Sequence, residues 1–429
     1  MTQSPNIMRF DPLLRAKTNE LAQAVQCLRD ALLLHETDSG SRKRARKEAD
    51  KEKFGLAVEA LACNLILLSA IESSPKLAVP RSHGFLWRGD GSANPVYGQH
   101  FLSAINGLAS LGLIEEERRG YRLSARMRVP SLIRPSTALA QHLPLAPPDW
   151  RSVKQIDDRA LIILKEGKDD DGRAATIAFR ETANTRQLAG QMRRINEFLR
   201  SADIGVTGQN TGLSLGKDGQ VIAPYRRSLR RIFNNDNWQH GGRLAGGFWM
   251  GMERGERFER IRIDGERIVD VDYRQLFPRL AYVRARKPQP VGDIYDVAGD
   301  GSGRDGWKTL MNAMLFSEGT LRGWPKDTLQ HFPPGTKLRD AIKMLVARQA
   351  PIADLFGAGL GFQLMRIESD MLIGIITYLA SIGVTALPLH DAVLVAESKA
   401  DVAADAMHAA FSMGSGSSCA IVSVEFCER

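Results

Sequence analysis

The sequence has little cysteine and no recognisable targeting segment. Four of its 429 residues are cysteines, and none forms a Cys-x-x-Cys pair or a Cys/His metal spacing. This excludes a disulfide framework and a zinc site as organising features. The N-terminus also lacks the basic-then-apolar order of a secretory signal peptide. We therefore expect a cytoplasmic protein in a reducing compartment.

Long hydrophobic runs are scarce, and the one uncharged stretch is interrupted. Residues 371–389 carry no charge and approach the length needed to span a membrane. However, Gly383 and Pro388 lie within the stretch, and His390 and Asp391 follow it directly. The pattern predicts a buried helix to about Ser381, a turn at Gly383 and then a strand. We expect no membrane partner.

The charge balance is basic. Lys and Arg total 58 against 49 Asp and Glu, which gives a net charge of +9. This favours a polyanionic partner such as nucleic acid. The length predicts two or three domains, and the sequence contains no internal repeat.

The first 145 residues indicate two modules. Residues 1–79 look helical, and their charge run at 41–53 mixes both signs, as a solvated helix or loop does. In residues 80–145, an apolar helical face ends at Gly112, and two short strand-like pieces follow it. Arg118, Arg119 and Gly120 join these pieces. The order predicts a winged helix with a basic hairpin tip.

The partner of this winged helix is open between a protein and nucleic acid, because a fold does not fix a function. Its arginines favour nucleic acid: Arg118, Arg119, Arg122, Arg126, Arg128 and Arg134. We expect Arg118 and Arg119 to contact nucleic acid, and a replication protein is the other candidate partner. A proline-rich linker at 143–150 marks a domain boundary. Residues 146–240 then include an amphipathic basic helix at 185–202.

Three later segments carry the candidate chemistry. In residues 265–283 a strand with Asp270 and Asp272 turns into a helix, and side chains two apart on a strand share a face. In residues 304–317, Arg304 and Lys308 lie one turn apart on a helix, a spacing that suits a triphosphate.

The third segment, residues 387–398, reads as a buried apolar strand that contains Asp391. A buried carboxylate without a partner costs several kcal/mol or more, so it pairs, shifts its pKa or binds a metal. Two strand carboxylates in a basic protein predict two Mg²⁺ ions, about 3.5–4 Å apart, at a phosphoryl-transfer site. Mn²⁺ is an alternative metal.

In this order, the three segments resemble motifs A, B and C of the family A DNA polymerases, whose type member is bacterial DNA polymerase I. The family's motif A is D-Y-S-Q-I-E-L-R, matched by Asp272, Tyr273, Gln275 and Arg279. Its motif B is R-x-x-x-K-T-x-x-F-x-x-x-Y, matched by Arg304, Lys308 and Thr309. Its motif C is H-D-E, matched by His390 and Asp391. "GGRLAGG" at 241–247 is similar to the family's T-G-R-L-S-S stretch.

The resemblance covers roughly residues 185–429 and implies roles for the matched residues. Asp272 and Asp391 would hold the metal, together with the Tyr273 carbonyl. Nucleotide binding would involve Arg304, Lys308, Phe277, Asn312 and Phe316. Arg243 and Gln275 would contact the primer-template.

The sequence departs from the family at several positions. Asn312 replaces an aromatic residue, Phe316 a tyrosine, Phe277 the glutamate that restricts ribose, and Ala392 the motif C glutamate. Asp270 or Glu397 could substitute for that last carboxylate. Single-subunit RNA polymerases also lack it, which keeps an RNA polymerase or primase open as an alternative. A replication initiator with a degenerate palm is a further alternative.

The expected architecture is therefore α+β. It comprises a helical region at 1–79, a winged helix at 80–145, a helical thumb at 146–240, and a palm with an antiparallel sheet and reduced fingers at 241–429. The expected activity is addition of deoxynucleoside triphosphates to a DNA primer.

Overall fold

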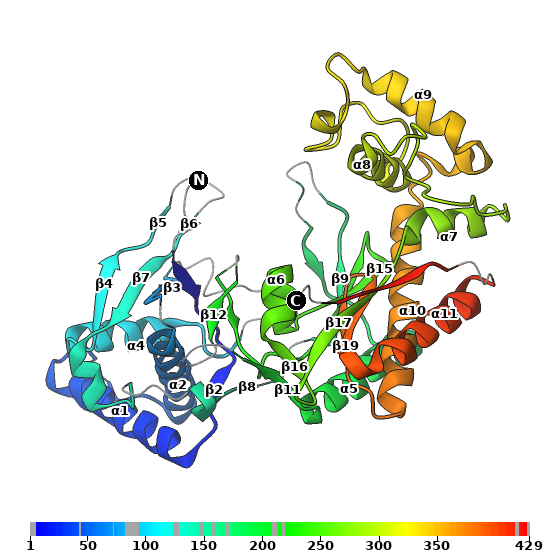
Figure 1. Ribbon diagram of the computed structural model, residues 1–429. Helices are drawn as coiled ribbons and strands as arrows, with labels where there is room; N and C mark the ends of the chain where they lie inside the picture. The colour runs from blue at the N-terminus through cyan, green and yellow to red at the C-terminus, as the bar shows by residue number, and fades with distance from the viewer. Residues whose placement is uncertain are drawn as a thin grey trace. The chain divides into compact units, whose positions relative to one another are not determined.

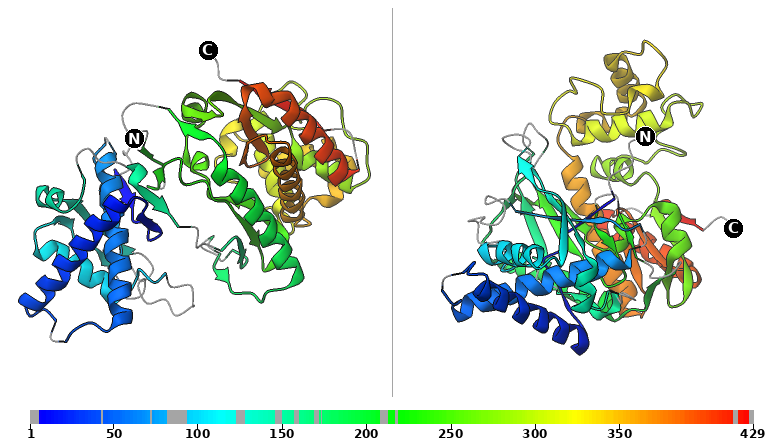
Figure 2. Two further views of the ribbon diagram at one scale, coloured as in Figure 1. Left: turned by 90° about the horizontal axis from the view of Figure 1, so that it is seen from below. Right: turned by 90° about the vertical axis from the view of Figure 1, so that its left-hand side faces the viewer.

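The computed structural model describes residues 6–42, 44–71, 73–81, 94–122, 128–145, 150–156, 160–168, 172, 174–207, 213–216, 219–416 and 420–426. Cys419, Cys427 and Arg126 lie outside the described residues. The fold is mixed α+β with mainly antiparallel sheets, which confirms the predicted class (Figures 1 and 2). The chain forms two compact units: unit 1 is Met1–Arg159 with Val206–Arg226, and unit 2 is Ala160–Gly205 with Arg227–Arg429.

Unit 1 contains three described α-helices and a four-stranded sheet. The helices are α1 (Asn19–Asp38), α2 (Glu48–Ala70) and α4 (Gln99–Ser110). The sheet has the order β1 (Ile7–Arg9), β3 (Lys76–Val79), β7 (Ser131–Pro135) and β4 (Ile114–Arg118). Two-stranded pairs are β2 (Leu14–Ala16) with β8 (Val153–Gln155), β5 (Tyr121–Arg122) with β6 (Arg128–Val129), and β12 (Ser214–Leu215) with β13 (Val221–Ile222). The 3₁₀ helices are η1 (Thr137–Gln141) and η2 (Trp150–Ser152).

The helix α2 forms the centre of one core in unit 1. Its buried residues pack with α1, α4 and the sheet, and with Leu213, Val221 and Ala223 from the returning segment. Residues 1–79 and 80–145 therefore share a core, and the predicted division between them is not a structural boundary. By length and composition alone α2 could cross a membrane, but 72% of its most apolar stretch is buried in the fold. A buried core helix passes the same test.

The predicted hairpin tip at Arg118-Arg119-Gly120 is wrong. The strand β4 pairs with β7, and β5 pairs with β6, so these residues lie partway along one arm of a longer hairpin. Gly120 does not form a turn; its lack of a side chain allows the neighbouring strand to approach its backbone closely. A Cβ on Gly120 would lie 2.7 Å from the Val129 carbonyl oxygen, and its N–H donates to Ser131 Oγ at 2.8 Å.

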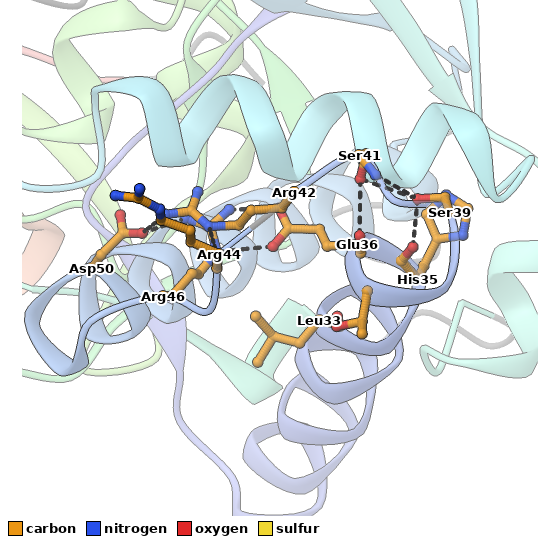
Figure 3. Close-up of polar contacts among 10 residues, drawn as sticks. Leu33, His35, Glu36, Ser39, Ser41, Arg42, Arg44, Arg46 and Asp50 are labelled. Atoms are coloured by element: carbon orange, nitrogen blue, oxygen red, sulfur yellow. Dashed lines mark hydrogen bonds and ion pairs between the residues drawn. The ribbon is translucent and has the colours of Figure 1, made fainter.

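The charge run between α1 and α2 is less solvated than predicted (Figure 3). The Arg46 side chain is only 2% exposed and donates to both carboxylate oxygens of Glu36, at 2.5 and 3.0 Å. It also donates to Asp50 at 2.8 Å, and its guanidinium lies 4.2 Å from the Phe54 ring centroid. Arg42 donates to the same Asp50 oxygen at 2.9 Å. Arg46 therefore ties the end of α1 to the start of α2.

Replacing Arg46 by methionine should destabilise α1 and α2 by about 3 kcal/mol, because two carboxylates lose their buried partner. Amide hydrogen exchange followed by mass spectrometry should show faster exchange in both helices, with unit 2 as an internal reference. The control is Arg44→Met, since Arg44 is an exposed neighbour in the same loop. Equal exchange in the two variants would show that the Arg46 ion pairs contribute little.

Unit 2 is built on a six-stranded sheet of order β11-β16-β17-β19-β18, with β20 also paired to β17. Its strands are β11 (Ile204–Val206), β16 (Ile261–Ile263), β17 (Glu266–Tyr273), β18 (Ala386–Leu389), β19 (Ala392–Ala396) and β20 (Val422–Glu425). A second sheet, β10-β9-β14-β15, contains β9 (Ile162–Lys165), β10 (Thr176–Ile177), β14 (Arg230–Asn234) and β15 (Asn237–Ala245).

The helices of unit 2 pack on these sheets or on one another. They are α5 (Ala183–Ser201), α6 (Arg254–Arg260), α7 (Leu276–Arg284), α8 (Arg304–Phe316), α9 (Leu338–Arg348), α10 (Gly361–Ser381) and α11 (Ala400–Ser415). The 3₁₀ helices are η3 (Phe248–Gly251), η4 (Leu329–His331), η5 (Ala350–Leu355) and η6 (Glu397–Lys399). The long helix α10 packs against β15, α7, α8 and α11 (Figure 1).

Two sequence predictions in unit 2 are confirmed and one is not. The helix α10 ends at Ser381, Gly383 has a φ of 74°, and β18 follows, as predicted for residues 371–389. The basic helix predicted at 185–202 is α5. Residues 146–240 are not a helical thumb: apart from α5, their described elements are strands and one 3₁₀ turn, divided between the two units.

Candidate active site

A β-hairpin places Asp391 beside the central strand of unit 2. The strands β18 and β19 are joined by a two-residue turn, His390-Asp391, in which His390 has a φ of 58°. The prediction that Asp391 lies inside a strand is therefore wrong. Within the buried run, a polar pair forms a tight turn at the point where the strand direction reverses. The turn lets the Asp391 carboxylate leave the apolar strands while staying next to β17.

The strand β17 brings two more carboxylates to this place. In its antiparallel pairing with β19, Asp272 lies opposite Ala392, the residue after Asp391. Asp270 lies opposite Leu394 and is two residues before Asp272, so both point to one face of the sheet. Because both residues lie in β17, Asp270 and Asp272 share one face of the sheet, as predicted. The Asp391 charge acts on both carboxylates.

Burial raises the pKa of these carboxylates most, and repulsion from neighbouring negative charges adds to the rise at Asp270 and Asp272. Burial, followed by the charges of Asp391 and Asp270, raises the pKa of Asp272 to about 8. Burial and the nearby Glu425 raise the pKa of Asp270 to about 6. Burial also raises the pKa of Asp391. The Oδ1 atoms of Asp270 and Asp272 are buried, and they have no hydrogen-bond partner among the described residues. These are the properties of a site that requires positive charge.

Part of that positive charge comes from α8, which forms where predicted. Lys308 is exposed, and its ammonium acts on both Asp272 and Asp391, lowering the pKa of each. Arg304 lies one turn earlier on the helix, pairs with Asp293, and its guanidinium lies 5.5 Å from the Tyr295 ring centroid. The helix therefore carries two cations, and the Lys308 charge reaches the acidic cluster.

A buried carboxylate that the sequence did not reveal also faces the hairpin. Glu368, on α10, is 1% exposed and accepts two hydrogen bonds from Arg243, at 3.0 and 2.9 Å. The pKa of Glu368 is raised to about 7, mainly by burial and also by the Asp391 charge. The hydrogen bonds and charge of Arg243 act in the opposite direction. Arg243 itself is 39% exposed. The only sequence signal for Glu368 is a charge on the apolar face of a helix.

Phe277 and Phe316 belong to a row of half-buried rings from four elements. The Phe277 ring centroid lies 5.7 Å from that of Phe316, which lies 5.2 Å from that of Phe362. His240 stacks on Phe362 at 6.0 Å. The Arg243 guanidinium lies 5.6 Å from the Phe277 ring centroid, so the row reaches the pair formed by Arg243 and Glu368. The row places apolar ring surface beside Arg243, whose charge also lowers the pKa of Asp391.

Other predicted residues have mainly internal partners. Gln275 adopts a φ of 59°, donates to Asp293 at 2.9 Å and accepts from the Ile294 N–H at 3.0 Å. Tyr273 ends β17, so its carbonyl lies at the strand end next to Asp272, while its hydroxyl donates to the Met407 carbonyl. Asn312 lies on α8 and contacts the Tyr295 hydroxyl; its Oδ1 is buried without a hydrogen-bond partner among the described residues.

Two residues were candidates to replace the motif C glutamate. Only Asp270 lies on the same face of the sheet as Asp272. Glu397 follows β19, and its neighbour Ala396 pairs with Ile268. Glu397 is six positions beyond Asp391, which corresponds to roughly 20 Å along an extended strand. Glu397 therefore lies at the far end of the strand. Asp270 shares the face of Asp272.

Arg118 and Arg119 belong to unit 1, whereas the carboxylates described above belong to unit 2. Several basic residues of their sheet are neutralised by acids on β4. Glu117 pairs with Lys76 and, at 2.9 Å, with Arg134, while Glu116 pairs with Arg81 at 3.5 Å. Arg119 is exposed. The net positive charge of this face is thus smaller than the count of arginines predicts.

No family model matches the chain, and a comparison with curated proteins finds no match. The residues that the structure describes contain no group of three or more His, Cys, Asp and Glu side chains arranged to hold a metal ion. A site for Mg²⁺ does not need such a group, because this ion takes one or two protein carboxylates together with substrate phosphates and water. The orphaned carboxylate oxygens of Asp270 and Asp272 fit that chemistry.

Proposed function

We propose that the chain is a template-directed nucleotidyltransferase that extends a DNA primer with deoxynucleoside triphosphates. One observation carries the proposal: two half-buried carboxylates with raised pKa values, Asp272 on β17 and Asp391 on the adjoining hairpin, lie within reach of the Lys308 charge on α8, which also carries Arg304. Phosphoryl transfer requires anionic metal ligands close to cations that bind phosphate. The order of these segments resembles the family A polymerases.

Each residue would then have a defined task. Asp272 and Asp391 would hold two Mg²⁺ ions, with the Tyr273 carbonyl at the strand end as a further oxygen ligand. When bound, these ions would lower the pKa of the primer 3′-hydroxyl and neutralise charge on the transferring phosphate. Lys308 and Arg304 would hold the triphosphate along α8, and the row of rings would lie against the base pair. Arg243 would contact the duplex.

The direct test is primer extension by homogeneous protein. Deoxynucleotides and ribonucleotides should be offered separately, with and without a primer, on a defined DNA template in Mg²⁺. Template-dependent extension with deoxynucleotides supports the proposal. Synthesis from ribonucleotides would favour the RNA polymerase or primase instead. Single-subunit RNA polymerases also lack the motif C glutamate, so the same two carboxylates would suit that reaction. Template binding without synthesis would favour an initiator.

Unit 1 would contribute binding. Its order of α2, β3, α4 and a two-armed hairpin is what supports a winged helix here. The exposed Arg119 supports a nucleic-acid contact, whereas the pairing of Arg134 with Glu117 leaves a protein partner as the second candidate.

Phe277 should act as the residue that excludes a 2′-hydroxyl. Its ring lies next to the Phe316 ring and the Arg243 guanidinium, and these neighbours restrict how far it can move aside for a ribose. Phe277→Ala should raise the ratio of ribonucleotide to deoxynucleotide incorporation by about 10- to 100-fold, measured as kcat/KM for each substrate. Phe362→Ala, two rings along the same row, is the matched control. If wild type uses both sugars equally, Phe277 does not discriminate.

A further inference from the structure

The loop between α7 and α8 approaches the cluster through Asp293, whose carboxylate divides its two oxygens between different partners. Its Oδ1 accepts the Gln275 side-chain amide and the Tyr295 backbone N–H, both at 2.9 Å. Its Oδ2 accepts the Nε–H of Arg304. One oxygen therefore fixes the carboxylate to the loop and to the N-cap of α7, and the other holds the cation of α8.

The surroundings of Asp293 are themselves restrained. Gln275 accepts from the Ile294 N–H at 3.0 Å, and Gln349 donates to the Ile294 carbonyl at 3.0 Å. Gln349 in turn accepts from the Tyr282 hydroxyl on α7 at 2.8 Å. The turn at residues 293–295 is thus tied to the N-cap of α7, to Tyr282 within α7 and to the residue before η5. A carboxylate on such a turn keeps its position when its partners move.

The orientation of Arg304 follows from this anchor. Asp293 occupies its Nε, and the two terminal amino groups make no hydrogen bond to the residues that the structure describes. The guanidinium lies beside the Tyr295 ring, and 43% of the side chain is exposed. A guanidinium held by Nε presents its other N–H groups as a fork, which is the geometry that binds phosphate oxygens in pairs.

We propose that Asp293 is a positioning residue that orients Arg304 toward the distal phosphates of a nucleoside triphosphate. The inference rests on the proposed function for its substrate, but it concerns a residue outside the three motifs. A freely rotating arginine would lose side-chain entropy when phosphate binds, and the anchor removes part of that loss beforehand. Asp293 itself touches no phosphate. Its effect is therefore transmitted through Arg304.

The test uses an isosteric variant. Asp293→Asn keeps the Oδ1 acceptor for Gln275 and Tyr295 and replaces the Oδ2 that receives the Arg304 Nε–H. The KM for deoxynucleotides should rise about 3- to 10-fold with little change in kcat, because the lost contact orients bound triphosphate before and during the reaction. Arg304→Ala should raise KM at least as much. Adding Asp293→Asn to Arg304→Ala should change KM less than about twofold, because the two residues act through one contact.

The matched control is Asp305→Asn. The Asp305 carboxylate lies 3.9 Å from an Arg304 amino group, but it is 74% exposed and does not anchor the guanidinium. KM should not change in this variant. An unchanged KM in Asp293→Asn overturns the inference, as does full additivity with Arg304→Ala. A lower KM also overturns it, because Asp293 would then compete with the triphosphate for Arg304.

Binding of inorganic tripolyphosphate, measured by calorimetry on the same variants, separates this inference from the proposed function. If the wild type extends no primer, but Asp293→Asn weakens tripolyphosphate binding only when Arg304 is present, the positioning role stands and the polymerase proposal fails. If primers are extended and neither KM nor tripolyphosphate binding depends on Asp293, the positioning role fails and the polymerase proposal stands.

Discussion

Replacing Asp272 or Asp391 by asparagine should lower the rate of nucleotide incorporation by at least about a thousandfold. Asparagine has nearly the same shape as aspartate, so the β17 pairing and the hairpin turn should survive. The negative charge that binds the metal ions is lost, and the Lys308 cation no longer faces a balanced pair of anions. Single-turnover primer extension with saturating primer-template would measure the effect on chemistry alone.

Two controls define that result. Glu397→Gln removes a carboxylate from the far end of β19 and should leave the rate unchanged. Binding of primer-template by the Asp272→Asn protein should be close to wild type, because neither carboxylate supplies a cation to the phosphate backbone. Extension by either asparagine variant at a rate near that of wild type in Mg²⁺ would exclude the two-metal assignment.

The same substitution at Asp272 should stabilise the metal-free protein. Between the ordinary aspartate pKa and the raised value of about 8, the folded state holds a proton that the unfolded state has released. The stability that this proton provides is complete below the ordinary pKa and is lost as the pH rises to about 8. Asp270 and Glu368, with pKa values of about 6 and 7, act in the same direction.

At pH 8 in a chelator, Asp272→Asn should therefore raise the free energy of unfolding by about 2–4 kcal/mol, below the ceiling of ~5 kcal/mol that the shift allows. The difference should shrink as the pH falls toward the ordinary aspartate pKa and approach zero near about pH 3, where Asp272 is protonated in both the folded and the unfolded state. Urea denaturation at a series of pH values would measure it. Added Mg²⁺ should stabilise wild type more than the variant, through ligand linkage. A variant less stable than wild type at pH 8 would contradict the electrostatic account of the cluster.

How far the sequence predicted this site depends on the range of each interaction. Arg304 and Lys308 lie one turn apart because helical spacing is local, and α8 begins and ends with the quoted motif. The uncharged run at 371–389 divided correctly into helix, turn and strand because Gly383 marks the turn. The sequence predicts a strand at Asp391 because its apolar neighbours hide the two-residue turn. In that turn His390 takes a backbone conformation that residues with a side chain rarely adopt.

The features that the sequence did not reveal depend on partners far along the chain. Glu368 and Arg243 are 125 residues apart, and neither residue type alone indicates a buried pair. The predicted hairpin tip is wrong because Gly120 was read as a turn residue. Its lack of a side chain instead lets the Val129 carbonyl approach the backbone. The prediction of a helical thumb is wrong because short strands such as β9 and β14 pair with each other across β10, α5, β11, β12 and β13. No local sequence pattern indicates such a distant pairing.

The division of the chain between the units limits how the protein can be shortened. The backbone passes from one unit to the other at residues 159–160, 205–206 and 226–227. The returning segment supplies Leu213, Val221 and Ala223 to the core around α2. A chain begun at residue 160 would carry this segment with its apolar side chains uncovered, and one ended there would leave a gap in the other core. The N-terminal unit therefore cannot be added or removed as a terminal cassette, and the two units must be inherited, expressed and folded as one piece.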